Sequence, residues 1–211
     1  MAVTPSQLAE ADTGLPLSER RFSPRQEQVL DVLEEIFFQD GLNVTVGDLA
    51  SRTHCSRRTL YELAPSKEQL FVLVFDRMRR RLRKEGLRAA AAERTPEKQI
   101  EAFVRAGLGV FKPASPAFME AIARYEPARW LFDFHLTLTR EFLVERMEEG
   151  IAAGQFREVH PGLVAEALLA AVRRVTEPSV LDANGLTAAE ALEELFRLVI
   201  HGLVKPGPAK G

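Results

Sequence analysis

Residues 55–70 read CSRRTLYELAPSKEQL, and this stretch predicts a short helix, a stop and the start of a second helix. Ser56 is a suitable N-cap because its hydroxyl can accept a hydrogen bond from an N–H group of the first helical turn. Pro65 ends the short helix, since its ring clashes with a continuing helix, and Ser66 caps the next one. The short helix should therefore end near residue 64.

Two arginines, Arg57 and Arg58, occupy the first turn of this short helix, where the helix dipole disfavours cations. An anionic partner would remove the conflict, and arginine can form two hydrogen bonds with guanine O6 and N7 in the major groove. Thr59 and Tyr61 carry hydroxyls suited to phosphate oxygens. Lys67 begins the next helix, where a cation and backbone N–H groups could converge on a phosphate. Together these residues predict a DNA-reading surface.

The stretch also fits a longer spacing, A-x5-S-x2-T-L-Y-x4-S-K-E, over residues 50–68. On this spacing, residues 45–70 resemble the helix-turn-helix of the TetR family of transcriptional regulators. The chain departs from the family pattern at residues 54–55, where His-Cys replaces the usual Gly-Val. It departs again at 63–64, where Leu-Ala replaces a tyrosine or histidine followed by phenylalanine. The resemblance implies an all-α, TetR-like protein that binds DNA as a homodimer and responds to a small-molecule effector.

Thr45 is predicted to cap a helix at about residues 46–53, just before the turn. The resemblance implies that Thr45 also contacts a phosphate, as the equivalent position does in many family members. Plain capping, which needs no DNA, is the competing interpretation. The predicted DNA-binding residues are Thr45, Ser56, Arg57, Arg58, Thr59, Tyr61 and Lys67.

The composition favours an all-α fold without disulfides or membrane spans. Of the 211 residues, 46% are hydrophobic, and long stretches of Ala, Leu, Glu and Arg outnumber runs of β-branched residues. A single cysteine excludes an internal disulfide and suits a reducing cytoplasm. No apolar run approaches the roughly 20 residues of a membrane span, and no secretion signal begins the chain, so we expect a cytoplasmic protein.

The net charge of −2 does not exclude DNA binding, because the distribution of charge matters more than its sum. Between Arg52 and Arg88 there are eleven Arg and Lys residues and four acidic residues, a local charge of +7. This basic segment contains most of the predicted DNA-reading surface.

Cap and proline signals, combined with apolar periodicity, predict nine helices. They are expected at about residues 24–40, 46–53, 57–64, 67–92, 96–112, 116–125, 127–153, 161–175 and 187–204. The predicted organisation is a flexible N-terminal arm (1–22), a helix-turn-helix DNA-binding domain (23–69), a helical ligand-binding and dimerisation domain (70–204) and a loose tail (205–211).

Large aromatic side chains on neighbouring helices of the second domain can enclose an apolar cavity of ligand size, although such residues are first of all core. The candidate ligand-binding residues are Phe103, Trp130, Phe134, His135 and Leu138. The last two helices, at about 161–176 and 187–204, are unusually apolar for an outer layer. A two-fold dimer would bury them and place two recognition helices in successive major grooves, roughly 34 Å apart.

Metal and enzyme motifs are missing from the sequence. The four histidines and the cysteine have no ligand spacing, and no nucleotide-binding loop or nucleophile elbow is present, so we expect no metal, no cofactor and no enzymatic activity. Cys55 is expected to be a small buried filler, with a redox switch as the alternative. The sequence thus predicts a repressor that binds a palindromic operator as a homodimer and is released by a small apolar molecule. The alternative is a helical small-molecule-binding protein with a degenerate DNA-binding head.

Overall fold

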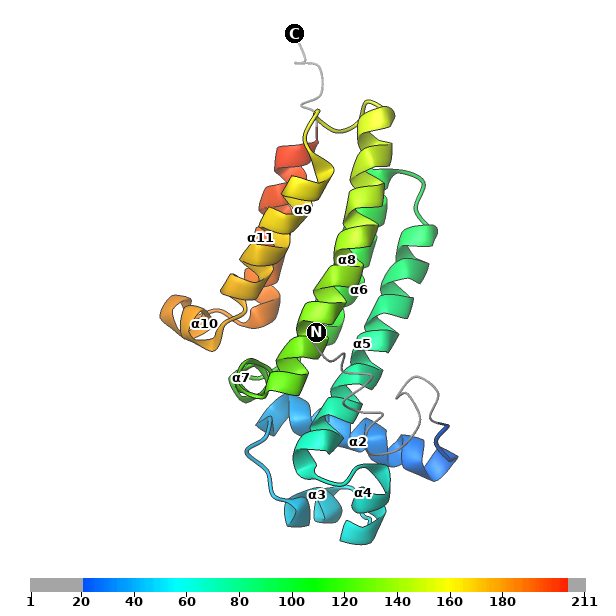
Figure 1. The fold of residues 1–211 in the computed structure, drawn as a ribbon, viewed down its shortest axis with the longest axis vertical. Helices are drawn as coiled ribbons and strands as arrows, with labels where there is room; N and C mark the ends of the chain where they lie inside the picture. Colours follow the sequence, from blue (N-terminus) through cyan, green and yellow to red (C-terminus); the bar gives the residue numbers. More distant parts are fainter. Residues whose placement is uncertain (1–20, 205–211) are drawn as a thin grey trace, which may run out of the picture. The chain divides into compact units, whose positions relative to one another are not determined.

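The computed structural model describes residues 21–204, and helices make up most of this part of the chain (Figure 1). In chain order they are α2 (Pro24–Asp40), α3 (Val46–Arg52), α4 (Arg57–Leu63), α5 (Lys67–Ala91), α6 (Pro96–Phe111), α7 (Pro116–Arg124), α8 (Glu126–Ala152), α9 (Pro161–Val175), α10 (Pro178–Asn184) and α11 (Ala188–Leu203). The all-α prediction is confirmed. Within residues 21–204, β-structure is limited to one isolated bridge, and no helix is long and apolar enough to cross a membrane. The predicted tail and nearly all of the predicted arm lie outside the described residues.

The described part of the chain has ten helices where nine were predicted, because α10 was not expected. This helix has Pro178 at its first position, and Gly185 follows its last residue in the left-handed conformation, with φ of 63°. Its seven residues are fewer than the roughly 11 over which apolar periodicity can be read. Only the proline and the glycine marked it in the sequence.

Local end signals place the other helices close to their predicted bounds. Ser23, Thr45 and Thr187 each form a capping box with the residue three positions later. Proline occupies the first turn of α2, α6, α7 and α9, where its missing N–H is not needed. The starts of these helices are therefore set by local features, which are capping hydrogen bonds and first-turn prolines.

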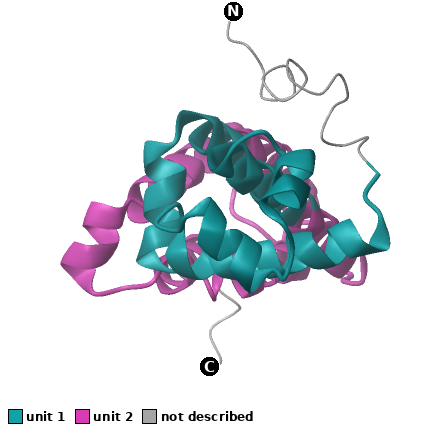
Figure 2. Ribbon diagram, turned by 90° about the horizontal axis from the view of Figure 1, so that it is seen from below, with its two compact units in different colours: residues 1–80, 115–133 teal, residues 81–114, 134–211 magenta. Residues whose placement is uncertain are grey.

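The chain divides into two compact units, neither of which is a single stretch of sequence (Figure 2). Unit 1 comprises residues 1–80 and 115–133, and unit 2 comprises residues 81–114 and 134–211. In the described part, unit 1 contains α2, α3, α4 and α7 with the first parts of α5 and α8. Unit 2 contains α6, α9, α10 and α11 with the remainder of those two long helices. The functional boundary at residues 69 and 70 stays a prediction, since these units are defined by packing.

Four buried phenylalanines from three helices form the centre of unit 1. The ring centroids are 5.3 Å apart for Phe37 and Phe71, 5.6 Å for Phe71 and Phe118, and 5.9 Å for Phe75 and Phe118. Each such aromatic pair adds about 0.5–1.5 kcal/mol to the burial of its rings. This cluster holds α2, α5 and α7 in one core.

In unit 2, α11 packs against both α6 and α9. The rings of Phe103 on α6 and Phe142 on α8 stack with centroids 4.3 Å apart. Helix α5 continues without interruption through Gly86, and a Cβ at this position would lie 2.9 Å from the Phe103 ring. The glycine therefore permits close packing of α5 on α6.

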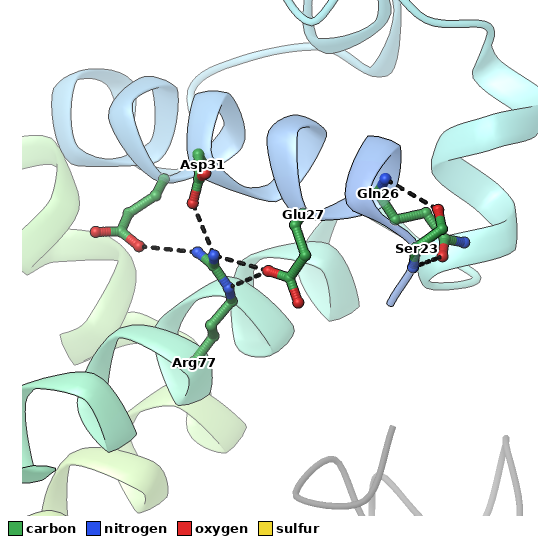
Figure 3. Close-up of polar contacts among 6 residues, drawn as sticks. Ser23, Gln26, Glu27, Asp31 and Arg77 are labelled. Carbon is green, nitrogen blue, oxygen red and sulfur yellow. Dashed lines mark hydrogen bonds and ion pairs between the residues drawn. The ribbon is translucent and has the colours of Figure 1, made fainter. Parts of the chain in front are cut away.

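Arg77 of α5 is the centre of a charge cluster with three carboxylates that lie along one face of α2 (Figure 3). Its Nη2 donates hydrogen bonds to Glu27 Oε2 at 2.8 Å and Asp31 Oδ1 at 2.7 Å, and its Nη1 lies 3.6 Å from Glu34 Oε2. Burial opposes the charged guanidinium, but the bonds with Asp31 and Glu27 outweigh it and raise the pKa of Arg77 above its ordinary value. The cluster therefore ties α2 to α5.

Arg77→Ala should destabilise the protein by about 2–4 kcal/mol, because it leaves three neighbouring carboxylates, one of them largely buried, without their cation. Thermal or urea unfolding would measure the change. Arg124→Ala is the matched control, since Arg124 in the same unit pairs with Glu120 at 2.9 Å but has an 81% exposed side chain. The control should change stability by less than about 1 kcal/mol. Equal effects of the two variants would contradict the conclusion that the Arg77 cluster ties α2 to α5.

Candidate nucleic-acid interface

Helices α3 and α4 are joined by a tight turn at residues 53–56. His54 in this turn has φ of 50°, a left-handed conformation that is rare for residues other than glycine. Cys55 is half-buried, and its Sγ lies 3.1 Å from Thr53 Oγ1. The turn thus has the geometry that a glycine would supply, but it is built with a histidine.

Helix α2 braces this turn and α3 through polar contacts at both of its ends. Arg25 Nη2 donates a hydrogen bond of 3.1 Å to the carbonyl of His54, which holds the left-handed residue in place. At the other end, Arg52 of α3 forms an ion pair with Asp40. These contacts could not be predicted from the sequence, because each joins residues that are 12 or more positions apart. The position of the turn therefore depends on α2.

Helix α4 has one buried side and one exposed side. Leu60 and Leu63, three positions apart on one side of the helix, are fully buried. Arg57, Arg58 and Tyr61 are exposed, and Tyr61 keeps 50% of its surface accessible. The structure thus brings three of the predicted DNA-binding side chains to the solvent side of one short helix.

Ser56 and Thr59 are engaged with each other at the start of α4. Ser56 Oγ accepts a hydrogen bond of 3.0 Å from the Thr59 N–H, and the two hydroxyls share a second bond of 2.9 Å. Capping is therefore the role of Ser56 that the geometry describes.

Arg58 donates to Glu62 Oε1 at 3.1 Å, but its side chain is 90% exposed, so this pair is weak and can open toward another anion.

Thr45 is committed to a capping box at the start of α3. Its hydroxyl donates to Asp48 Oδ2 at 2.6 Å and accepts from the Asp48 N–H at 3.2 Å. The side-chain bond from Thr45, followed by the bond from its backbone N–H, lowers the pKa of Asp48 below its ordinary value. A phosphate contact by Thr45 would have to replace the Asp48 carboxylate as the acceptor of its hydroxyl proton.

Lys67 lies at the start of α5 with its side chain 23% exposed. Its Nζ donates a hydrogen bond of 2.7 Å to the carbonyl of Leu42 in the loop between α2 and α3. An ammonium group has three N–H donors, so two others are left for Glu68, at 3.9 Å, or for an outside anion. This lysine fastens the loop before α3 in addition to its predicted role.

The helix-turn-helix segment is matched by a known family. Residues 29–74 match the family described as bacterial regulatory proteins, tetR family. The chain carries a TetR-family helix-turn-helix domain. No curated protein sequence matches the chain significantly. The TetR-family assignment confirms the DNA-binding, transcription-regulating class predicted for this segment.

Solved structures share the fold over most of the chain at low sequence identity. A TetR-family transcriptional regulator from Agrobacterium tumefaciens is 16% identical, with a TM-score of 0.67, and the match covers 86% of this chain and 98% of that one. A putative transcriptional regulator from Saccharomonospora viridis, in complex with choline, is 15% identical, with a TM-score of 0.70 and the same coverage. The transcriptional regulator FadR from Bacillus subtilis, in complex with stearoyl-CoA, is 14% identical, with a TM-score of 0.63 over 84% of this chain and 98% of that one. The TetR-like architecture is thereby confirmed.

The five predicted ligand-binding residues have different surroundings. Phe103 is buried in its stack with Phe142, and His135 is buried on α8. Phe134 is 39% exposed, and the carbonyl of Leu138 accepts a hydrogen bond of 3.1 Å from Arg83. These four lie in unit 2, whereas half-buried Trp130 lies in unit 1. Their role as a ligand site stays a prediction.

Unit 2 also contains an open groove of about 240 Å³ between α6 and α11. Its lining combines apolar side chains, among them Val104 and Phe196, with acidic and basic ones, which are Glu101, Arg105, Glu193 and Arg197. None of the five predicted ligand-binding residues lines it. The groove is therefore separate from the predicted effector site.

Proposed function

We propose that this chain is a homodimeric, ligand-responsive repressor that binds a palindromic operator through α4 and is released by a small apolar molecule. One observation carries the proposal: the solvent side of α4 presents Arg57, Arg58 and Tyr61, and the first turn of this helix contains no acidic residue. This helix belongs to the TetR-family domain and is braced by α2. Uncompensated arginines at a helix start favour an anionic partner, and a DNA groove supplies one.

The proposed DNA-binding residues divide into two groups. Arg57 and Arg58 are the base-reading side chains, because a guanidinium can bind the O6 and N7 edge of guanine with two hydrogen bonds. Thr45, Ser56, Thr59, Tyr61 and Lys67 hold phosphates, which fixes the register of α4 without reading sequence. The exposure of both arginines supports the first assignment.

Arg57→Lys should keep binding to random DNA but lose most of its preference for the operator, since lysine retains the charge and lacks the two-pronged guanidinium. The expected loss of preference is roughly 5- to 150-fold for each half-site, from about 1–3 kcal/mol per specific guanine contact. Fluorescence anisotropy with DNA from upstream of the chain's own gene and with random DNA, at several salt concentrations, would measure it. Lys67→Gln is the comparison, because glutamine can still donate to the Leu42 carbonyl.

Lys67→Gln should weaken binding to both DNAs alike. It should also make the DNA affinity less dependent on salt, by the equivalent of about one phosphate contact in each DNA-binding head. Equal loss of preference in the two variants would contradict the division between base reading and phosphate holding. Indifference of the wild-type protein to both DNAs would favour the alternative, a small-molecule-binding protein with a degenerate head.

The proposed dimer interface is formed by α9 and α11, the predicted 161–176 and 187–204 segments. These helices pack side by side and expose Leu163 by 68% and Leu198 by 73%. A single exposed leucine is common on a protein surface. These two, however, lie on the two helices whose apolar character predicts a dimer interface. A two-fold axis would bury both copies of each leucine.

Leu198→Glu should weaken the dimer by at least about 30-fold, because a carboxylate would be buried without a partner at the interface. Sedimentation equilibrium over a range of concentrations would measure the dissociation constant. Leu87→Glu is the control, since Leu87 is another exposed leucine of unit 2, 36% accessible, outside α9 and α11. A Leu198→Glu protein as dimeric as this control would rule out this part of α11 as the contact.

The proposed effector is apolar. Proteins of this fold hold molecules as different as choline and stearoyl-CoA, so the fold alone does not choose between them. In unit 2 the predicted site contains two phenylalanines, a leucine and a buried histidine, and none of these four side chains carries a negative charge that would bind a small cation.

Stearoyl-CoA should shift the fluorescence of the single tryptophan, Trp130, and weaken operator binding, whereas choline should do neither. Phe134→Ala should weaken the stearoyl-CoA effect several-fold by removing apolar contact area. Leu87→Ala, a truncation outside the predicted site, is the control. A response to choline alone would contradict the apolar assignment.

A further inference from the structure

Gly47 is the second residue of α3, and the guanidinium of Arg57 lies directly over it. A Cβ added to Gly47 would be 2.9 Å from Arg57 Nη2 and 3.8 Å from Arg57 Cζ. Real Cβ atoms essentially never lie within 3.0 Å of another heavy atom in this way. The Arg57 side chain therefore rests on bare backbone, in a place that any residue with a Cβ would close.

Arg57 forms no hydrogen bond or ion pair with any other residue in the described range 21–204. This distinguishes it from its neighbour Arg58, whose guanidinium is bonded to Glu62 at 3.1 Å. The donors of Arg57 are thus available to an outside partner, while its position is limited by packing on the first turn of α3. A long side chain that is already ordered loses less entropy when it binds.

Glycine is a poor choice for a helix interior, because it loses more backbone freedom on folding than any other residue. No turn explains Gly47, since its conformation is not left-handed and it lies inside α3. Within α3 itself an alanine would serve better. The neighbour that a Cβ at residue 47 would displace is the guanidinium end of the Arg57 side chain, which approaches from α4.

We propose that Gly47 is a positioning residue of the DNA-binding site: its missing side chain lets Arg57 lie across the start of α3, pre-placed for DNA. The inference rests on the proposed function, because it assumes that Arg57 binds DNA. The inference adds a residue of α3 to the site. Gly47 has no side chain to contact DNA, and it acts on DNA binding only through the position of Arg57.

Gly47→Ala is the direct test, because the Arg57 side chain is flexible enough to move aside and let the protein fold. The variant should bind operator DNA about tenfold more weakly, since two heads per dimer each lose the ordering of one long side chain. Its melting temperature should rise by about 2 °C, as expected for replacing a helical glycine. Weaker DNA binding by a more stable protein cannot be attributed to damage of the fold.

Gly109→Ala is the matched control, since Gly109 is a helical glycine of α6 whose added Cβ would meet nothing within 4 Å. It should raise the melting temperature similarly and leave operator binding unchanged. The decisive comparison is Gly47→Ala in an Arg57→Ala background, where the tenfold loss should shrink to less than about twofold because the two residues act through one interaction.

Two results would overturn the inference alone: Gly47→Ala binding like the wild type while Arg57→Ala is impaired, or Gly47→Ala causing the same loss with and without Arg57. An Arg57→Ala variant that binds operator and random DNA like the wild type would overturn the DNA-contact role of Arg57 and the inference together. A failure of the inference alone therefore differs from a failure of the proposed function, because only the latter leaves DNA binding by the Arg57→Ala variant unchanged.

Discussion

The ion-pair cluster between Arg77 and the acidic face of α2 is the interaction on which the proposed DNA-binding surface depends. Arg77 holds α2 against α5, and α2 in turn holds the helix-turn-helix through Arg25 at the turn and Asp40 at α3. The short helices α3 and α4 have only seven residues each, too few to be stable in isolation. Their geometry is therefore imposed by α2, which the Phe37 ring and the Arg77 cluster fix in unit 1.

The arrangement of charges explains how a chain with a net charge of −2 can present a basic surface. Four acidic residues of this region are engaged within unit 1: Glu27 and Asp31 pair with Arg77, Asp40 pairs with Arg52, and Asp48 completes the cap of α3. Arg57 has no such partner among the described residues, and Arg58 has one weak, exposed partner. Neutralising the acids inside unit 1 leaves the exposed side of α4 positive.

Sequence reasoning succeeded where the signal is local and failed where it is not. Caps such as Ser23 and Thr187, and prolines in first turns, located nine helices because each acts within three or four residues. Helix α10 has only seven residues, too few for apolar periodicity to reveal a helix. The bonds from Arg25 to His54 and from Lys67 to Leu42 span 29 and 25 residues, so only the folded chain could show them.

Three departures from good local chemistry fall within the helix-turn-helix. Gly47 weakens α3, His54 takes a left-handed conformation that suits glycine, and two arginines begin α4 without an acid in its first turn. Several other helix starts have an acid in the first turn, namely Glu27, Glu97 and Glu190. The first turns of α7, α9 and α10 also lack an acid, but each has a proline there and no arginine or lysine. Natural sequences tolerate such conflicts mainly at functional sites. Three such conflicts fall within residues 47–58, inside the segment that matches the TetR family, and this supports the proposed DNA-binding role of the segment.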